Sequence, residues 1–225
     1  MKPVCARALM LLCFLSLISG RAASQGYSLC GSLENGFGPF DYRVDKEHLV
    51  VVEKWHFNQQ VETLVRGNTS VNIGADISYT LRAYPNHHRA LMAMRNLARR
   101  EKVDKPAGST YTVACWFQRA ERFQPDDGMV KVLHGIYLMG AGRAQEAVAK
   151  LEAARSLDSG NPNVHYNLGL AYLDLRQYDK ALESAHRAYA AGFPLAGLRN
   201  RLKRAGQWHD SVDAVPETPP EGGAQ

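Results

Sequence analysis

The 225-residue sequence lacks any apolar run long enough to cross a membrane. Its longest run, residues 8–20, has 13 residues, whereas a spanning helix needs about 20. Lys2 and Arg7 precede the run and small residues follow it, which is typical of a cleavable secretory signal peptide. We expect a signal peptide over residues 1–24, cleaved after Ser24, and a periplasmic or secreted protein with no membrane span. An uncleaved anchor is the alternative.

The part of the chain that follows this leader has little net charge. The whole sequence holds 27 Lys and Arg against 22 Asp and Glu, but Lys2, Arg7 and Arg21 belong to the leader. The remaining 24 basic residues nearly balance the acidic ones. Such a small excess does not attract nucleic acid or an anionic membrane. We therefore expect neither of them as a partner.

Cysteine is also scarce after the leader. Of the four cysteines, Cys5 and Cys13 leave with the signal peptide, so Cys30 and Cys115 remain. Two cysteines in an oxidising compartment predict a disulfide. The alternative is that Cys115 is a small buried apolar residue on a helix face.

Motifs that carry chemistry are missing as well. The sequence has no Gly-x-Ser-x-Gly, no phosphate-binding loop and no Cys-x-x-Cys-His, so we expect no catalysis and no cofactor. His87 and His88 are adjacent and would point about 100° apart on a helix, which argues against a shared metal ion. A metal-dependent enzyme would need His56, His87 and His88 to cluster in space with Asp41 or Glu53.

A repeat with a period of 34 residues is the strongest positive signal. Small and apolar residues return at this spacing, which predicts a stacked array of helices. The pairs are Gly135 with Gly169, Ala147 with Ala181, Leu151 with Ala185, and Ala154 with Ala188. Val113, Phe117 and Ala120 continue the same step one unit earlier.

These residues resemble the tetratricopeptide repeat family. The closest unit has Leu-Gly-x-x-Tyr at residues 168–172, followed by Ala181 and Ala188 on the next helix. The resemblance implies an all-α fold in which antiparallel helical hairpins stack as a short right-handed solenoid. For function it implies only the recognition of a protein or peptide.

Helix signals fix the approximate elements of this array, which we place over residues 75–205. Asn58 is expected to cap a short helix and Asn86 the helix that follows Pro85. The helices predicted for the array are 76–83, 87–102, 110–123, 129–139, 144–157, 163–175, 178–191 and 195–205.

The two flanks of the array differ from it in composition. Residues 25–74 begin with a stretch rich in glycine and aromatic residues, and we expect an irregular segment that packs on the array. Residues 206–225 are rich in Pro, Gly and acidic residues, which predicts a disordered tail.

The first helix of each unit has a second apolar face, which must be buried against something other than its hairpin partner. The resemblance to the tetratricopeptide repeat family implies that this face is a partner-binding groove. The residues expected to line it are Met92, Asn96, Met129, Val132, Ile136, Tyr166, Leu170 and Leu173. The basic residues of the family's carboxylate clamp are not matched, which favours an apolar or mixed segment as the ligand. In the alternative, the N-terminal aromatic segment fills the groove and the protein is a structural subunit. The sequence predicts neither the partner's identity nor the oligomeric state.

Overall fold

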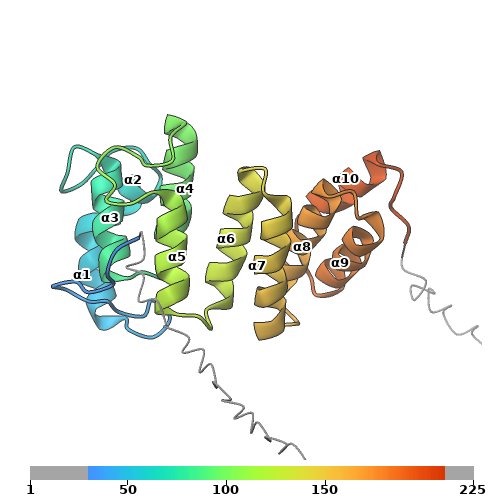
Figure 1. Cartoon of the computed structure of the whole chain (residues 1–225), viewed down its shortest axis with the longest axis horizontal. Helices are drawn as coiled ribbons and strands as arrows, with labels where there is room; N and C mark the ends of the chain where they lie inside the picture. Colours follow the sequence, from blue (N-terminus) through green and yellow to red (C-terminus); the bar gives the residue numbers. More distant parts are fainter. Residues whose placement is uncertain (1–29, 211–225) are drawn as a thin grey trace, which may run out of the picture.

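The computed structural model describes residues 30–210, and every regular element in this range is an α-helix (Figure 1). The predicted signal peptide with its cleavage site, and residues 211–225 of the predicted tail, lie outside it. None of the described helices is long and apolar enough to cross a membrane. They are α1 (Glu47–His56), α2 (Gln59–Glu62), α3 (Ile73–Ala83), α4 (His88–Glu101), α5 (Val113–Phe123), α6 (Gly128–Gly140), α7 (Ala144–Leu157), α8 (Pro162–Asp174), α9 (Tyr178–Ala190) and α10 (Gly197–Arg204).

Polar side chains begin several of these helices by accepting backbone N–H groups of the first turn. Asn58, Thr112 and Asp127 do so for α2, α5 and α6. At α8, Asn161 is the cap and Pro162 occupies the first helical position, where its missing N–H costs nothing. These local signals explain why the predicted and observed helix starts differ by only a few residues.

The cap of α4 differs from the prediction. His87, not Asn86, accepts the N–H of the first turn. Asn86 is fully buried and its amide nitrogen donates to Asp41 at 2.7 Å and to Asp127 at 2.9 Å. It therefore connects the N-terminal segment to the turn before α6, a role that no local pattern predicts.

Consecutive helices pack as antiparallel hairpins, and the hairpins stack in a row (Figure 1). The α6–α7 and α8–α9 hairpins turn within three residues, whereas α4 and α5 are joined by the longer connection 102–112. Along one side of the row, α4 contacts α6 and α6 contacts α8. This is the stacked helical solenoid that the 34-residue repeat predicts.

The repeated glycines permit the close approach of neighbouring helices. A Cβ atom at Gly135 would lie 2.7 Å from Cγ of Leu151, and one at Gly169 would lie 2.3 Å from Cδ2 of Leu198. Real Cβ atoms do not approach other atoms so closely, because close-packed interiors leave no room for the added volume. Glycine recurs at this position because the partner helix occupies the space of a side chain.

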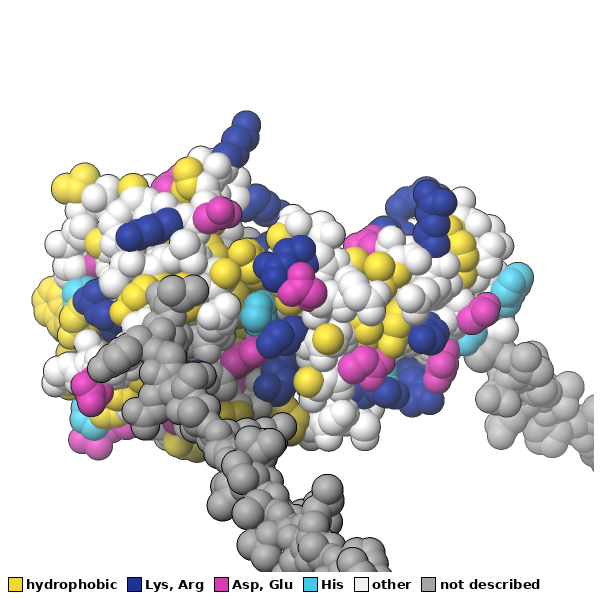
Figure 2. All heavy atoms as spheres, viewed as in Figure 1, with side chains coloured by type: hydrophobic (Ala, Val, Ile, Leu, Met, Phe, Trp, Pro, Cys, Tyr) yellow, Lys and Arg dark blue, Asp and Glu magenta, His cyan; other side chains and the backbone are white. Residues whose placement is uncertain are grey.

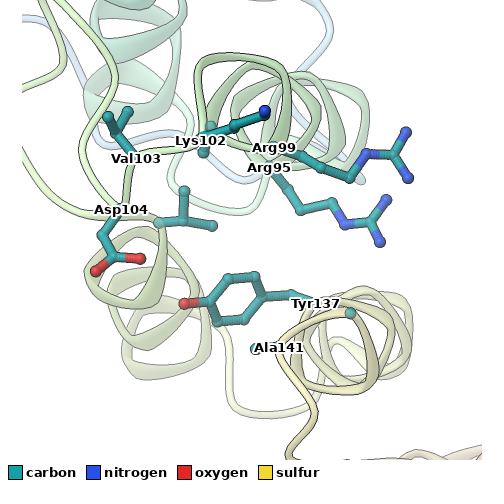
Figure 3. Close-up of a pocket in the computed structure, with 10 residues that line it drawn as sticks. Arg95, Arg99, Lys102, Val103, Asp104, Tyr137 and Ala141 are labelled. Carbon is teal, nitrogen blue, oxygen red and sulfur yellow. The ribbon is translucent and has the colours of Figure 1, made fainter.

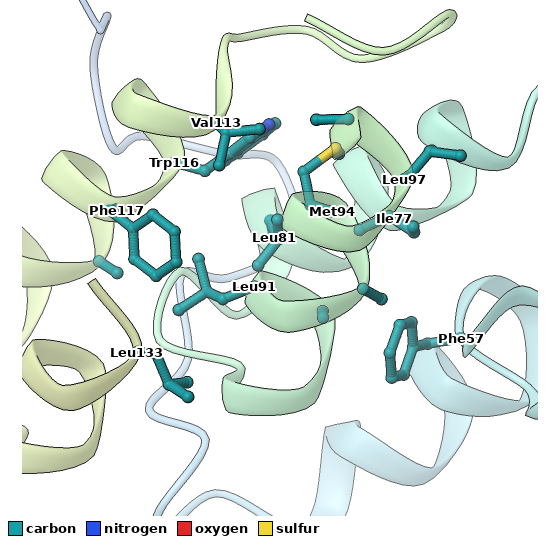
Figure 4. Packing of buried hydrophobic residues seen from close by; sticks show 14 of the residues in the cluster. Phe57, Ile77, Leu81, Leu91, Met94, Leu97, Val113, Trp116, Phe117 and Leu133 are labelled. Atoms are coloured by element: carbon teal, nitrogen blue, oxygen red, sulfur yellow. The ribbon is translucent and has the colours of Figure 1, made fainter. Parts of the chain in front are cut away.

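The buried side chains form two main clusters that meet at α6. The N-terminal cluster gathers residues of α3, α4 and α5 with Phe57 and Val61, and Figure 4 shows its side chains around α4. The C-terminal cluster joins α6 to α10 and consists largely of alanine and leucine at repeat positions. Partly buried residues of α6, among them Met129 and Ile136, pack against both clusters.

The segment predicted to be irregular is more ordered than expected, since α1 and α2 lie inside residues 25–74 and α3 begins at Ile73. In α1, Val52 is buried and Leu49 half-buried against Tyr84, and this packing favours a helix over a strand. Residues 30–46 do lack helix, and Phe37 and Phe40 pack on the array. The irregular part is therefore residues 30–46, and the expected short helix capped by Asn58 is α2.

A disulfide joins Cys30 to Cys115 on α5, with 5.1 Å between their Cα atoms. Beside it, the buried guanidinium of Arg119 donates to the backbone carbonyls of Cys30, at 2.9 Å, and of Ser32. Arg122 donates to the carbonyl of Gly31 at 2.6 Å. The start of the described chain is therefore fixed to α5 by one covalent bond and three charge-assisted hydrogen bonds.

Candidate partner-binding groove

The side of the array formed by α4 and α6, next to α2, holds the first part of the predicted groove. Met92 and Asn96 lie one turn apart on α4, so they share a face of that helix. Together with Met129 of α6 they line a single pocket of about 340 Å³. Three of the eight predicted groove residues therefore meet at one site.

The pocket has an apolar floor and a polar rim. Leu133 and Ala93 are buried beside the half-buried Met92 and Met129, so an apolar side chain of a ligand would replace water mainly against the two methionines. Leu133 is not among the eight predicted groove residues, although it lies one turn after Met129 on α6. This four-residue spacing places the two side chains on one face of the helix.

The charged groups at this rim are already paired within the protein. Arg89 donates to Glu62 at 2.7 Å and to Glu53 at 3.1 Å. The hydrogen bond from Arg89 lowers the pKa of Glu62, although partial burial opposes this shift. His88 contacts Asp127 at 2.9 Å. These pairs leave the Asn96 amide as the uncharged polar group facing the pocket.

A second pocket of about 310 Å³ follows the first toward the C-terminal ends of α4 and α6. Figure 3 shows Arg95 and Arg99 extending side by side from α4, with Tyr137 of α6 below them. Lys102 and Asp104 complete its charged lining. Within residues 30–210, none of its three cations forms an ion pair. Burial, and then repulsion from Arg99, lowers the pKa of Arg95, so an anion that entered here would meet unpaired positive charge.

The other five predicted groove residues do not join these pockets. Val132 and Leu173 are 2% and 8% exposed and belong to the C-terminal cluster, and neither lines either pocket. Tyr166 is covered by Phe193, whose ring stacks on it at 4.1 Å. Ile136 and Leu170 are partly buried against the same cluster. The helix period alone could not separate these positions from the groove, because α8 is packed on both of its apolar faces.

The described part of the N-terminal segment does not occupy either pocket. Phe40 stacks on His48 at 4.4 Å and the Tyr42 ring contacts His87 at 4.2 Å in a tilted arrangement. No residue from 30 to 46 lines the pocket at Met92 or the one at Arg95. These aromatic residues are thus half-buried at the N-terminal end of the array, and none of them lines an α4–α6 pocket.

The histidines do not converge on one site. His56 contacts Asp76, His87 contacts Glu53 and His88 contacts Asp127, with distances of 3.1, 3.1 and 2.9 Å. Among residues 30–210, no group of three or more His, Cys, Asp or Glu side chains is arranged to hold a metal ion. Each of these three histidines instead contacts its own carboxylate, and the first two contacts tie the N-terminal helices to the array.

Comparison with known proteins identifies the repeat. Residues 138–188 match the family model described as tetratricopeptide repeat. No curated protein sequence matches the chain. Among solved structures, one titled MamA MSR-1 C2 is similar, with 14% identity and a TM-score of 0.40. That match covers 53% of this chain and 65% of the other, just under two thirds of its length.

Proposed function

We propose that this protein, a stacked array of tetratricopeptide repeats, is an interaction scaffold that binds a segment of a partner protein along α4 and α6. The observation that carries the proposal is the pocket at Met92 and Met129, whose apolar floor is open to solvent while its charged rim is internally paired. Such a site gains free energy by removing apolar surface from water and performs no chemistry.

The two adjacent pockets suggest the chemistry of the bound segment. An apolar side chain of about the size of leucine or methionine fits against Met92, Met129 and Leu133. Further along the same helices, Arg95 and Arg99 offer unpaired charge to a carboxylate. The partner segment would therefore carry an apolar residue followed or preceded by an acidic one.

We place the scaffold in the periplasm or outside the cell. The Cys30–Cys115 disulfide supports this location, because such bonds persist in oxidising compartments. The leader-like residues 1–24 agree with it. Cell fractionation tests the location: recovery of the protein only in the cytosol, with both thiols reduced, would contradict it.

Two other functions are less well supported. A structural subunit with a self-filled groove would need the N-terminal segment in the pocket, and residues 30–46 pack elsewhere. A metal-dependent enzyme would need the histidines to share a site, whereas each one pairs with a different carboxylate.

Affinity capture from the native extract, followed by mass spectrometry, tests the scaffold function. Met92→Glu places a charge on the apolar floor, and Arg95→Glu with Arg99→Glu reverses the charge of the second pocket. Leu157→Glu is the matched control, because Leu157 is exposed on α7. We expect a partner that wild type and Leu157→Glu retain and that both pocket variants lose, with circular dichroism showing that all four chains fold. Equal capture by every variant would show that the binding site does not lie on α4 and α6.

A further inference from the structure

The N-terminal end of the array exposes apolar side chains that an end of a soluble array normally hides. On α1, Val50, Trp55 and Val51 are 70%, 51% and 45% exposed. The inward side of the same helix, with Val52 and Leu49, packs toward Tyr84. In the described range α1 contacts α3 and has no further helix on its outer side, so this face is unpartnered.

The opposite end of the array is closed in the usual way. α10 carries Arg199, Arg201, Lys203 and Arg204 around the two buried leucines Leu198 and Leu202. Figure 2 shows Lys and Arg side chains gathered at the right-hand end, where α10 lies, and hydrophobic side chains at the left-hand end around α1. Terminal repeats need a polar outer face to remain soluble as monomers. The N-terminal end does not have one.

The charges on the outer face of α1 indicate what covers it. Glu47, Val50, Val51, Lys54 and Trp55 follow one another along this face, and all five are exposed. These five residues form a stripe along α1. The stripe is complementary to a second copy of itself when a two-fold axis passes between Val50 and Val51. Antiparallel pairing with a second copy then sets Glu47 against Lys54 of the other chain, and Val50 against its Val51. Isologous contacts of this kind are how two-fold dimers form.

Glu47 and Lys54 also have ordinary places on the helix, in its first and last turns, where they suit the helix dipole. Their position relative to the apolar residues is what matters here. Glu47 and Lys54 are separated by seven positions, about 10 Å along the helix, and Val50 and Val51 lie at the midpoint. Neither charge forms an ion pair within residues 30–210, so both are available to a second molecule.

A hollow next to the stripe provides a place for the second copy's side chains. It has a volume of about 250 Å³ and lies among Val51, Trp55, Phe37, His56 and Tyr79. His56 and Tyr79 stack at 3.7 Å and form a flat aromatic wall. An apolar residue that projects from the other α1 would be buried there, and by symmetry each chain would offer both the projection and the hollow.

We propose that the protein self-associates as a two-fold dimer through the outer face of α1, with its residues paired in antiparallel register. The interface is independent of the α4–α6 pockets, which lie on other helices. It is small for a dimer, so association is reversible, with a dissociation constant on the order of 10 to 100 µM.

Sedimentation velocity of the full chain, from a few micromolar to several hundred micromolar, tests this dimer. We expect wild type to shift from monomer to dimer over this range. Glu47→Lys and Lys54→Glu each set like charges opposite one another and should weaken association on the order of tenfold. The variant with both substitutions carries the two charges exchanged and should restore the dissociation constant of wild type. Val51→Asp should abolish the dimer, whereas Leu195→Asp, at an exposed position near α10, should leave it intact.

Several outcomes would overturn the dimer. Wild type that stays monomeric at every concentration would show that the face is not a self-association site. A dimer that survives Val51→Asp would place the interface elsewhere. Failure of the double charge swap to restore association, with both chains folded by circular dichroism, would exclude the antiparallel register. Met92→Glu separates this interface from the proposed groove: it should leave the dimer unchanged.

Discussion

At its C-terminal end the array is held by packing between repeats, whereas at its N-terminal end it is held by a cross-link and by buried polar contacts. Around α8 and α9, alanines and leucines at the 34-residue spacing fill a continuous apolar core. Around α3 and α4, the Cys30–Cys115 disulfide, the carbonyl contacts of Arg119 and the Asn86 network join segments far apart in sequence. Regular repeats stabilise themselves through their neighbours, and the irregular end needs additional connections.

The outer surfaces of the two ends also differ, in the polarity of their exposed side chains. The last helix presents Lys203 and Arg204 to solvent, and the first presents Val50 and Trp55. One end is therefore finished as the boundary of a soluble array. The other retains the apolar character of an internal repeat, which is the basis for the dimer proposed above.

The largest expected effect comes from breaking the cross-link at the N-terminal end. Replacing both Cys30 and Cys115 by serine removes a bond that closes a loop of 85 residues. We expect a loss of about 4 kcal/mol in the free energy of unfolding, measured by chemical denaturation. Reductant should destabilise wild type by a similar amount and have no effect on the double variant. Equal stability of wild type with and without reductant would mean that the polar contacts alone hold this end.

A smaller effect is expected from disturbing the packing at the C-terminal end. Gly169→Ala brings a Cβ to 2.3 Å from the buried Leu198 side chain and 3.3 Å from the Ala181 carbonyl oxygen. Leu198 must move, and we expect a loss of about 2 kcal/mol. Gly128→Ala is the matched control, because the nearest atom there is 3.8 Å away. Helix propensity alone favours alanine at both positions, so if Gly169→Ala is tolerated as well as Gly128→Ala, the close helix contact does not explain why glycine recurs.

The difference between the ends also explains how much of the fold the sequence predicts. From α6 to α10 the predicted and observed helix bounds agree within about two residues, because caps, turns and repeat spacing are all local signals. In the N-terminal half, the short apolar run in α1 does not by itself distinguish a helix from a strand, and Asn86 does not cap α4 as predicted. Both depend on contacts with residues about 30 to 45 positions away, such as Val52 with Tyr84 and Asn86 with Asp41.

The candidate site shows the same limit. The α4 and α6 residues Met92, Asn96 and Met129 were placed on one groove from their helical spacing, and they do line one pocket. Val132 and Leu173 fit the same spacing but are buried, since the period gives the face of a helix and not what covers it. The basic pocket at Arg95 and Arg99 was missed because it forms only when the α4–α5 connection and the end of α6 come together.

The smallest expected effect is on the acid sensitivity of the N-terminal network. Burial alone would raise the pKa of Asp41, but hydrogen bonds from Arg43 and Asn86 outweigh it and lower the pKa from 3.8 to about 2. A carboxylate with a lowered folded-state pKa stabilises the protein above the unfolded value and loses that contribution as pH falls through the folded one. We therefore expect the denaturant concentration at the unfolding midpoint to decrease as the pH is lowered from 4 to 2.

Asp41→Asn sharpens this test because it removes the titrating group and keeps the shape of the side chain. It should lower the free energy of unfolding at pH 6, since the neutral amide no longer attracts Arg43. It should also reduce the acid slope, by which we mean the loss of stability between pH 4 and pH 2. Asn86→Ala removes a donor to both Asp41 and Asp127 and should reduce the slope as well. An acid slope that is unchanged in both variants would assign the sensitivity to carboxylates outside this network, and the N-terminal end would then depend on its cross-link and its packing alone.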